Sequence, residues 1–132
     1  MPLRWMMLAA FLVGSSLANA QRGSFEYFES LPKEYLGKRI TVFIIKAKEP
    51  VGDGDFRIFK IYTSDAKGDH ESYGWAKVPL KNAALFAKRH PLQTWPYRVK
   101  NASGVLRQVT EGDPVGKILN KGVFYLDTSL EN

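Results

Sequence analysis

Apolar positions along the chain predict a domain built mainly of β-strands. The clearest strand covers Arg39 to Lys48, where every residue from Ile40 to Ile45 is β-branched or aromatic. An unbroken run of this kind is typical of a strand that is buried on both faces along much of its length. Turn residues between 49 and 55 separate it from a second apolar stretch, Phe56 to Thr63. The two stretches therefore predict a β-hairpin.

The middle of the chain predicts a third strand and then the main helix. Tyr73 to Val78 follows a polar segment and is the third predicted strand. Residues 79–89 consist mostly of good helix formers, and Lys88 and Arg89 lie in the last turn, where the helix dipole favours cations. Pro91 is expected to end this helix.

The C-terminal part again favours strands joined by turns. Glycine-containing turns are expected at 101–104 and 120–122, because each lies between two apolar stretches. The strands predicted around them are Thr94 to Lys100, Val105 to Thr110, Val115 to Leu119 and Val123 to Thr128. Pro96 indicates that the first of these is an edge strand.

A short helical segment is predicted before the first strand. Phe25 and Phe28 lie three residues apart within Ser24 to Leu36, which places both rings on one face of a helix. Gly37 is expected to stop it. We expect this segment to pack against the domain as a short lid.

The order of elements is three strands, one helix and two to four further strands. This mostly β arrangement with one main helix resembles the five-stranded OB-fold barrel, which places its helix between the third and fourth strands. The resemblance covers roughly Gly37 to Thr128 and rests on element order alone. An SH3-like barrel or an open α+β sheet would use similar segments.

Residues 1–20 have the layout of a secretory signal peptide, with Arg4 before an apolar run and small residues at Ala18 to Ala20. The apolar run, Trp5 to Val13, is too short to span a bilayer as a helix, which takes about 20 residues. We therefore expect export to the periplasm or out of the cell, and no transmembrane segment after cleavage. Residues 21–132 are expected to form one domain, and the absence of cysteine means that it folds without disulfides.

No residue pattern in the chain predicts a catalytic residue, a metal site or a cofactor. His70 lies between Asp69 and Glu71, but neighbours on an extended segment point in alternate directions, so we favour a solvated loop. Residues 53–55 lack the further oxygen ligands and the glutamate of a calcium-binding loop. Neither a Gly-x-Ser-x-Gly elbow, a P-loop nor a dinucleotide motif occurs.

Strand parity points to one candidate ligand-binding face. Tyr73, Trp75 and Lys77 share one face of their strand, and Lys60 shares a face with Tyr62 on the preceding strand. Because lysine is rarely buried, we expect these faces to meet water, with the intervening apolar residues inside. If the strands pair, the candidate face consists of Lys60, Tyr62, Tyr73, Trp75 and Lys77. The alternative is that the helix or the N-terminal segment covers these rings, and the lysines only reach the edge.

A second alternation occurs further along the chain. Trp95, Tyr97 and Val99 alternate with Pro96, Arg98 and Lys100, so we expect the first set in the core. Arg98 and Lys100 are then surface charges.

Together these features predict a small exported binding or accessory module without catalytic activity. Its expected partner is an anionic polymer, a glycan or an envelope protein, because the formal net charge is +6 and rings beside lysines suit flat, anionic ligands. Two other classes stay open. One is an inhibitor or envelope-assembly subunit that uses exposed strand edges, and the other is a hydrolase acting on envelope material.

Overall fold

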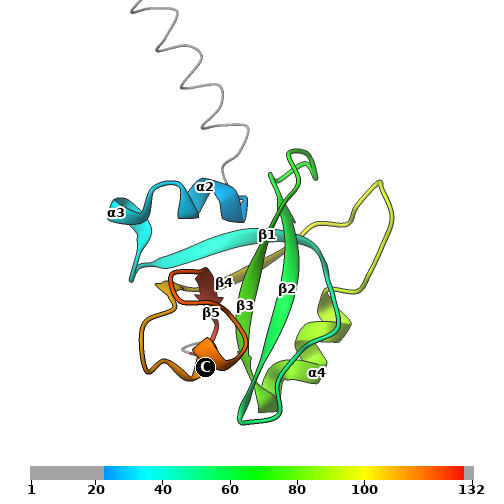
Figure 1. Ribbon diagram of the computed structural model, residues 1–132. Helices are drawn as coiled ribbons and strands as arrows, with labels where there is room; N and C mark the ends of the chain where they lie inside the picture. Colours follow the sequence, from blue (N-terminus) through cyan, green and yellow to red (C-terminus); the bar gives the residue numbers. More distant parts are fainter. Residues whose placement is uncertain (1–22, 130–132) are drawn as a thin grey trace, which may run out of the picture.

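The computed structural model describes residues 23–129, which form a closed β-barrel of five strands with one main helix (Figure 1). The strand order is β1-β2-β3-β5-β4, with β3 and β5 parallel and the other neighbours antiparallel. The strands are β1 (Arg39–Ala47), β2 (Phe56–Ser64), β3 (Ser72–Pro79), β4 (Lys100–Gln108) and β5 (Phe124–Asp127). Helix α4 (Leu80–Arg89) lies between β3 and β4, which confirms the predicted OB-fold-like architecture.

The leader predicted at residues 1–20 lies outside the described residues. Within residues 23–129, no helix has the length and apolar content needed to cross a membrane.

Alternate residues of the strands fill the barrel. The predicted inward residues of β2 and β3 are all buried, among them Phe59 and Ala76. Helix α4 closes one end of the barrel, where the ring of Phe86 lies 4.7 Å from that of Phe59. The inward residues that the sequence predicts for β2 and β3 are therefore confirmed, while Ile58 on the outer face of β2 is buried as well.

Strand β1 is buried on one face rather than both over its first half. Ile40 and Val42 point into the core, whereas Arg39 and Thr41 are exposed. In the second half Ile44 and Ile45 are both buried, because a β-bulge shifts the register with β2 between Ile44 and Lys46. A bulge adds one residue to a strand and so reverses the parity of the positions that follow it.

The expected turn at 101–104 is wrong, because these residues lie inside β4. Gly104 pairs with Ile40 of β1, and a Cβ on it would stand 2.5 Å from the Asp127 carbonyl oxygen. The glycine is therefore required by the close approach of β5 and not by a turn. The strand expected at Thr94 to Lys100 is instead a loop that joins α4 to β4.

The expected strand Val115 to Leu119 is also wrong. This segment contains a short 3₁₀ helix, η1 (Pro114–Lys117), and β5 starts only at Phe124. The carboxylate of Asp113 accepts a hydrogen bond from the Val115 amide, at 3.0 Å, and so caps η1.

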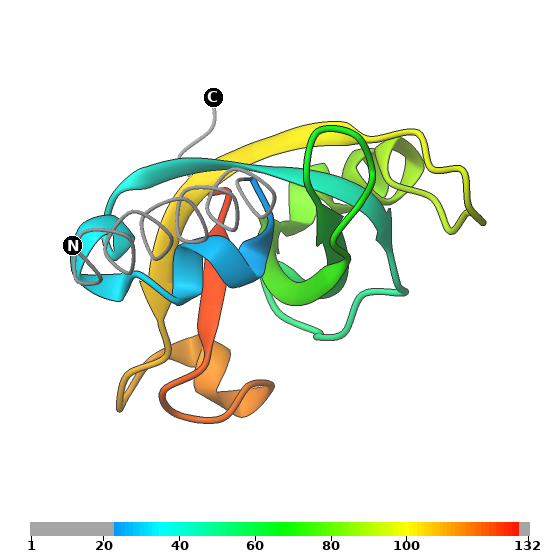
Figure 2. The ribbon, with the colours of Figure 1, turned by 90° about the horizontal axis from the view of Figure 1, so that it is seen from above.

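The predicted N-terminal lid is present as two short helices, α2 (Phe25–Glu29) and α3 (Pro32–Tyr35). Figures 1 and 2 show them side by side, at the opposite end of the barrel from α4. Phe25 and Phe28 are both buried in the core, as their spacing predicts. Gly37 follows α3 with a φ of 81°, a conformation that glycine adopts without strain.

Candidate ligand-binding face

The five residues predicted from strand parity lie together on the outer face of β2 and β3. In the register of this strand pair, Lys60 is opposite Trp75 and Tyr62 is opposite Tyr73, while Lys77 is opposite Ile58. Tyr73 is 56% exposed, and the other four predicted residues are half-buried. The structure thus brings all five predicted residues to one surface.

Lys60 stands at the centre of the rings on this surface. Its Nζ lies 4.4 Å from the ring centre of Tyr73, 5.6 Å from that of Tyr62 and 5.9 Å from that of Trp75. A cation near the face of an aromatic ring is attracted by the ring quadrupole. The ammonium group and the rings therefore hold one another in place on the barrel surface.

Two residues that the strand pattern does not predict, Lys46 and Tyr97, extend this surface. The Nζ of Lys46 lies 4.9 Å from the ring centre of Tyr62 and 5.5 Å from that of Tyr97. Together they define what we call the aromatic–lysine row: Tyr73, Lys60, Tyr62, Lys46 and Tyr97. It runs from β3 across β2 and β1 to the α4–β4 loop.

Each missed residue has a definite structural cause. Lys46 faces outward because the β-bulge precedes it, and a bulge has no reliable signature in a single sequence. Tyr97 was expected in the core, but its segment is a loop that turns back between Gln93 and Arg98. The side chain of Gln93 holds that turn, since its Oε1 accepts from the Arg98 amide at 2.9 Å.

The expectation of a buried Trp95 is likewise wrong. Trp95 is 72% exposed at the α4–β4 loop, while Tyr97 and Val99 are half-buried. The alternation of these residues misled because a loop does not place alternate side chains on two faces of a sheet.

One end of the β2–β3 surface is covered by the connection between β4 and β5. A second apolar cluster forms there around Ile58, Val115 and Tyr125, and Trp75 packs against it. This cover comes from neither α4 nor the N-terminal segment, the two covers that the sequence suggested. Trp75 therefore both lines the candidate face and supports the packing of the β4–β5 connection.

Acidic residues border the candidate face on the side of α2. Glu26, Glu29 and Glu71 line a hollow of about 650 Å³ together with Tyr73 and Trp75. Burial, and then the nearby charge of Glu26, raise the pKa of Glu29 above its usual range. Glu26 and Glu29 lie on this side, whereas Glu71 reaches the aromatic–lysine row. Its carboxylate lies 3.9 Å from Nζ of Lys46 and accepts a hydrogen bond from the Tyr97 hydroxyl at 3.5 Å. An anionic ligand is therefore favoured at Lys60, and at Lys46 it would replace the carboxylate of Glu71.

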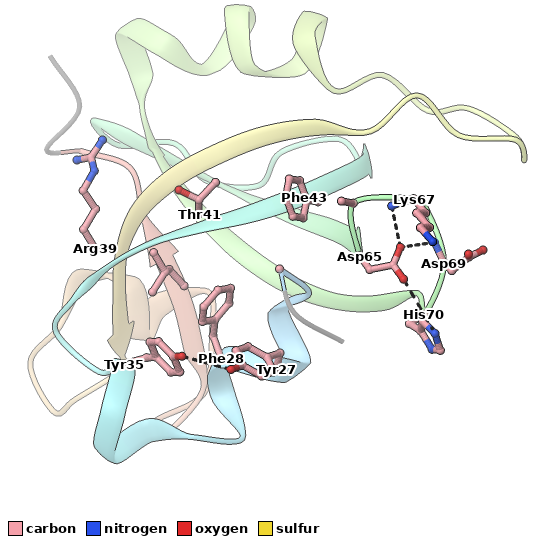
Figure 3. A pocket seen from close by; sticks show the side chains of 13 residues that line it. Tyr27, Phe28, Tyr35, Arg39, Thr41, Phe43, Asp65, Lys67, Asp69 and His70 are labelled. Atoms are coloured by element: carbon pink, nitrogen blue, oxygen red, sulfur yellow. Dashed lines mark hydrogen bonds and ion pairs between the residues drawn. The ribbon is translucent and has the colours of Figure 1, made fainter. Parts of the chain in front are cut away.

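A separate groove of about 820 Å³ lies between α2, α3, β1 and the β2–β3 loop (Figure 3). Its loop wall is organised by Asp65, whose carboxylate accepts from the backbone amides of Lys67 and Asp69. The same carboxylate lies 4.0 Å from Nε2 of His70. Over residues 23–129, no group of three or more His, Asp or Glu side chains is arranged to hold a metal ion.

Comparison of the chain with protein-family models, with curated proteins and with solved structures found no match. The candidate site therefore rests on the geometry of the described residues.

Proposed function

We propose that this protein is an exported binding module without catalytic activity, periplasmic or secreted, that holds a linear anionic ligand along the aromatic–lysine row. The observation that carries the proposal is the alternation of rings and ammonium groups across three neighbouring strands and the α4–β4 loop. Residues 1–20, with the layout of a signal peptide, support the location.

The chemistry of the row fits a chain of flat rings that carries negative charges. Exposed aromatic rings stack on bases or sugars, and each stacked base contributes about 1–3 kcal/mol. Lysines between the rings contact the anionic groups of the polymer, and binding releases the counterions of the polymer. OB-fold barrels bind oligonucleotides and oligosaccharides on the same two strands, β2 and β3, which supports this choice of surface.

A direct binding measurement tests the proposal. The chain without residues 1–20 is titrated with a short single-stranded oligothymidylate and with polygalacturonate, and binding is followed by tryptophan fluorescence and calorimetry. We expect saturable binding to at least one polymer, weakened by Lys60→Gln and by Tyr73→Ala. The matched controls are Lys33→Gln on α3 and Trp95→Ala on the α4–β4 loop, both exposed and outside the row.

Two results would overturn this assignment of the surface. One is no binding to either polymer at low salt. The other is an equal loss of affinity in the row variants and in the control variants, because general charge attraction would then explain the binding. Polymer binding that does not respond to salt would show that the lysines of the row do not contact the charges of the polymer.

The location is tested separately by N-terminal sequencing of the protein from separated cell fractions. We expect a chain that starts near Gln21 in the periplasm or the medium. An intact leader on cytosolic protein would contradict export.

A second candidate function is hydrolysis of envelope material in the groove of Figure 3. It is favoured by His70, which lines the groove at a φ of 59° beside the carboxylate of Asp65. The test is release of soluble fragments from purified peptidoglycan. Activity that His70→Asn abolishes and Asp69→Asn keeps would replace the binding proposal.

A further inference from the structure

A small cavity under the α4–β4 loop concentrates positive charge, and no residue of the aromatic–lysine row lines it. Its volume is about 130 Å³, and Arg89, Arg98 and Lys100 line it together with His90. Ile44 and Ile45 of β1 form its apolar floor. No acidic residue is among the described residues that line this cavity.

His90 lines this cavity and also the hollow between α4 and β4, and it carries a buried polar atom without a hydrogen-bond partner among the described residues. The residue is only 3% exposed, and its Nδ1 has no hydrogen-bond partner among the described residues. The imidazole ring of His90 packs against the ring of Phe86, with 4.6 Å between the ring centres. The backbone carbonyl of His90 accepts a hydrogen bond from the Ala47 amide at 3.0 Å, which ties this residue to β1. A buried polar atom without a partner is rare in folded proteins, and a ligand in the cavity would supply one.

The charges around His90 favour a negative partner. Burial, followed by the nearby charges of Arg89 and Lys100, lowers the pKa of His90 to about 4. The imidazole is therefore neutral near pH 7, and one of its nitrogens carries a proton that it can donate. An anion in the cavity would accept a hydrogen bond from this N–H group and offset part of the positive charge of the three cations.

We propose that this cavity is a binding site for a phosphate group, held by Arg89, Arg98 and Lys100 with Nδ1 of His90 as a buried donor. One guanidinium group can donate two parallel hydrogen bonds to two oxygens of the same phosphate group. The volume equals that of about four water molecules at ~30 Å³ each, which suits a group of five heavy atoms. The site is separate from the aromatic–lysine row and does not depend on the function proposed for it.

Titration with inorganic phosphate at constant ionic strength tests the site. The imidazole signals of the two histidines are followed by NMR, and the His70→Asn variant assigns them. We expect a saturable shift of the His90 signal and a rise in its pKa, while the signal of exposed His70 stays in place. A His90 signal that does not respond to phosphate, or that sodium chloride shifts equally, would overturn the proposal.

Charge-matched variants separate this cavity from general attraction of anions. Arg98→Gln is expected to weaken phosphate binding about tenfold or more, because it removes a charged hydrogen bond. Lys88→Gln, on α4 and outside the lining, should leave the affinity unchanged. His90→Phe keeps the ring packing against Phe86 but removes the donor, and it should also weaken binding. Equal effects of Arg98→Gln and Lys88→Gln would contradict the site.

The source of the phosphate group is found by comparing two oligothymidylates, with and without a 5′-phosphate. Tighter binding of the phosphorylated form, lost in Arg98→Gln, would show that the cavity holds the end of a polymer. Equal affinity together with the shift caused by inorganic phosphate would identify free phosphate as the ligand. Binding of inorganic phosphate should persist in Lys60→Gln. A negative result for polymer binding at the aromatic–lysine row would therefore leave the proposed phosphate site unaffected.

Discussion

The ring of Phe25 fills the place where a Cβ on Gly74 would stand. Its Cγ lies 2.3 Å from the ideal position of that missing atom, and Phe25 is completely buried. The amide of Phe25 also donates a hydrogen bond to Oγ1 of Thr63 on β2, at 2.8 Å. The first helix of the described chain is therefore fixed to β2 and β3, and it closes the barrel end beside the candidate face.

Gly74→Ala is expected to destabilise the fold by about 1–3 kcal/mol, because the added methyl group overpacks the site of Phe25. Urea unfolding measures the change. The control is Gly54→Ala, since no described atom lies within 4 Å of a Cβ there, and its stability should stay within about 0.5 kcal/mol. A Gly74→Ala variant as stable as the control would show that α2 does not pack as described.

Tyr73→Ala and Trp75→Ala are expected to differ in their effect on stability. Tyr73 is exposed, so its loss should weaken ligand binding and leave the free energy of unfolding nearly unchanged. Trp75 packs against the second apolar cluster, so its loss should also destabilise the fold, by about 2–3 kcal/mol. Thermal unfolding of both variants checks this, and a stable Trp75→Ala would mean that the cluster does not need the indole ring.

Lys46→Gln tests whether the row extends beyond β2. We expect the variant to weaken binding of a single-stranded oligonucleotide and to reduce the slope of log K against log salt by about 0.7. Binding isotherms at several salt concentrations give that slope. The control variant Lys33→Gln on α3 should have the slope of the parent protein. If Lys46→Gln also has the slope of the parent protein, the ligand contacts only β2 and β3.

The stability of the fold should depend on His90 between pH 6.5 and 4. Burial lowers the pKa of His90 to about 4 from its ordinary 6.5, so the unfolded chain binds the proton more tightly. The contribution of neutral His90 to the free energy of unfolding is complete above pH 6.5. It falls by up to about 3 kcal/mol as the pH drops to 4. Unfolding in phosphate-free buffer should show a flatter pH profile for His90→Gln.

Asp127 should contribute stability that disappears only in strong acid. Burial opposes its ionisation, but hydrogen bonds from Ser129 and Arg107 and the charge of Lys77 outweigh it and hold its pKa below the usual range. The contribution is present above the ordinary pKa of Asp and is lost as the pH falls through the lower value of the folded state.

Arg107→Gln measures the same interaction at neutral pH. The Nε of Arg107 lies 2.7 Å from Oδ2 of buried Asp127 but is itself half-exposed, so we expect a loss of about 1–2 kcal/mol. Lys121→Gln breaks the exposed pair with Glu111 and should give no measurable change. Similar unfolding curves for the two variants would contradict a structural role for the Arg107–Asp127 pair.

Local sequence patterns predicted most of the elements that position the candidate face. Alternation in β2 and β3 placed Phe59 and Ala76 inside and Lys60 and Trp75 outside, as the structure has them. The same reasoning failed for Trp95, because alternation was read in a segment that forms no ladder hydrogen bonds. Periodicity is informative only where backbone pairing fixes the direction of each side chain.

The sequence by itself determined the barrel strands up to β3, the position of the main helix and the outward residues of β2 and β3, since these follow from local periodicity and propensity. Only the tertiary structure decided that a bulge turns Lys46 outward, that Gly104 lies in a strand and that Tyr97 joins the row. It alone placed Arg98 beside His90. These features depend on contacts between segments far apart in the chain, which no local pattern encodes.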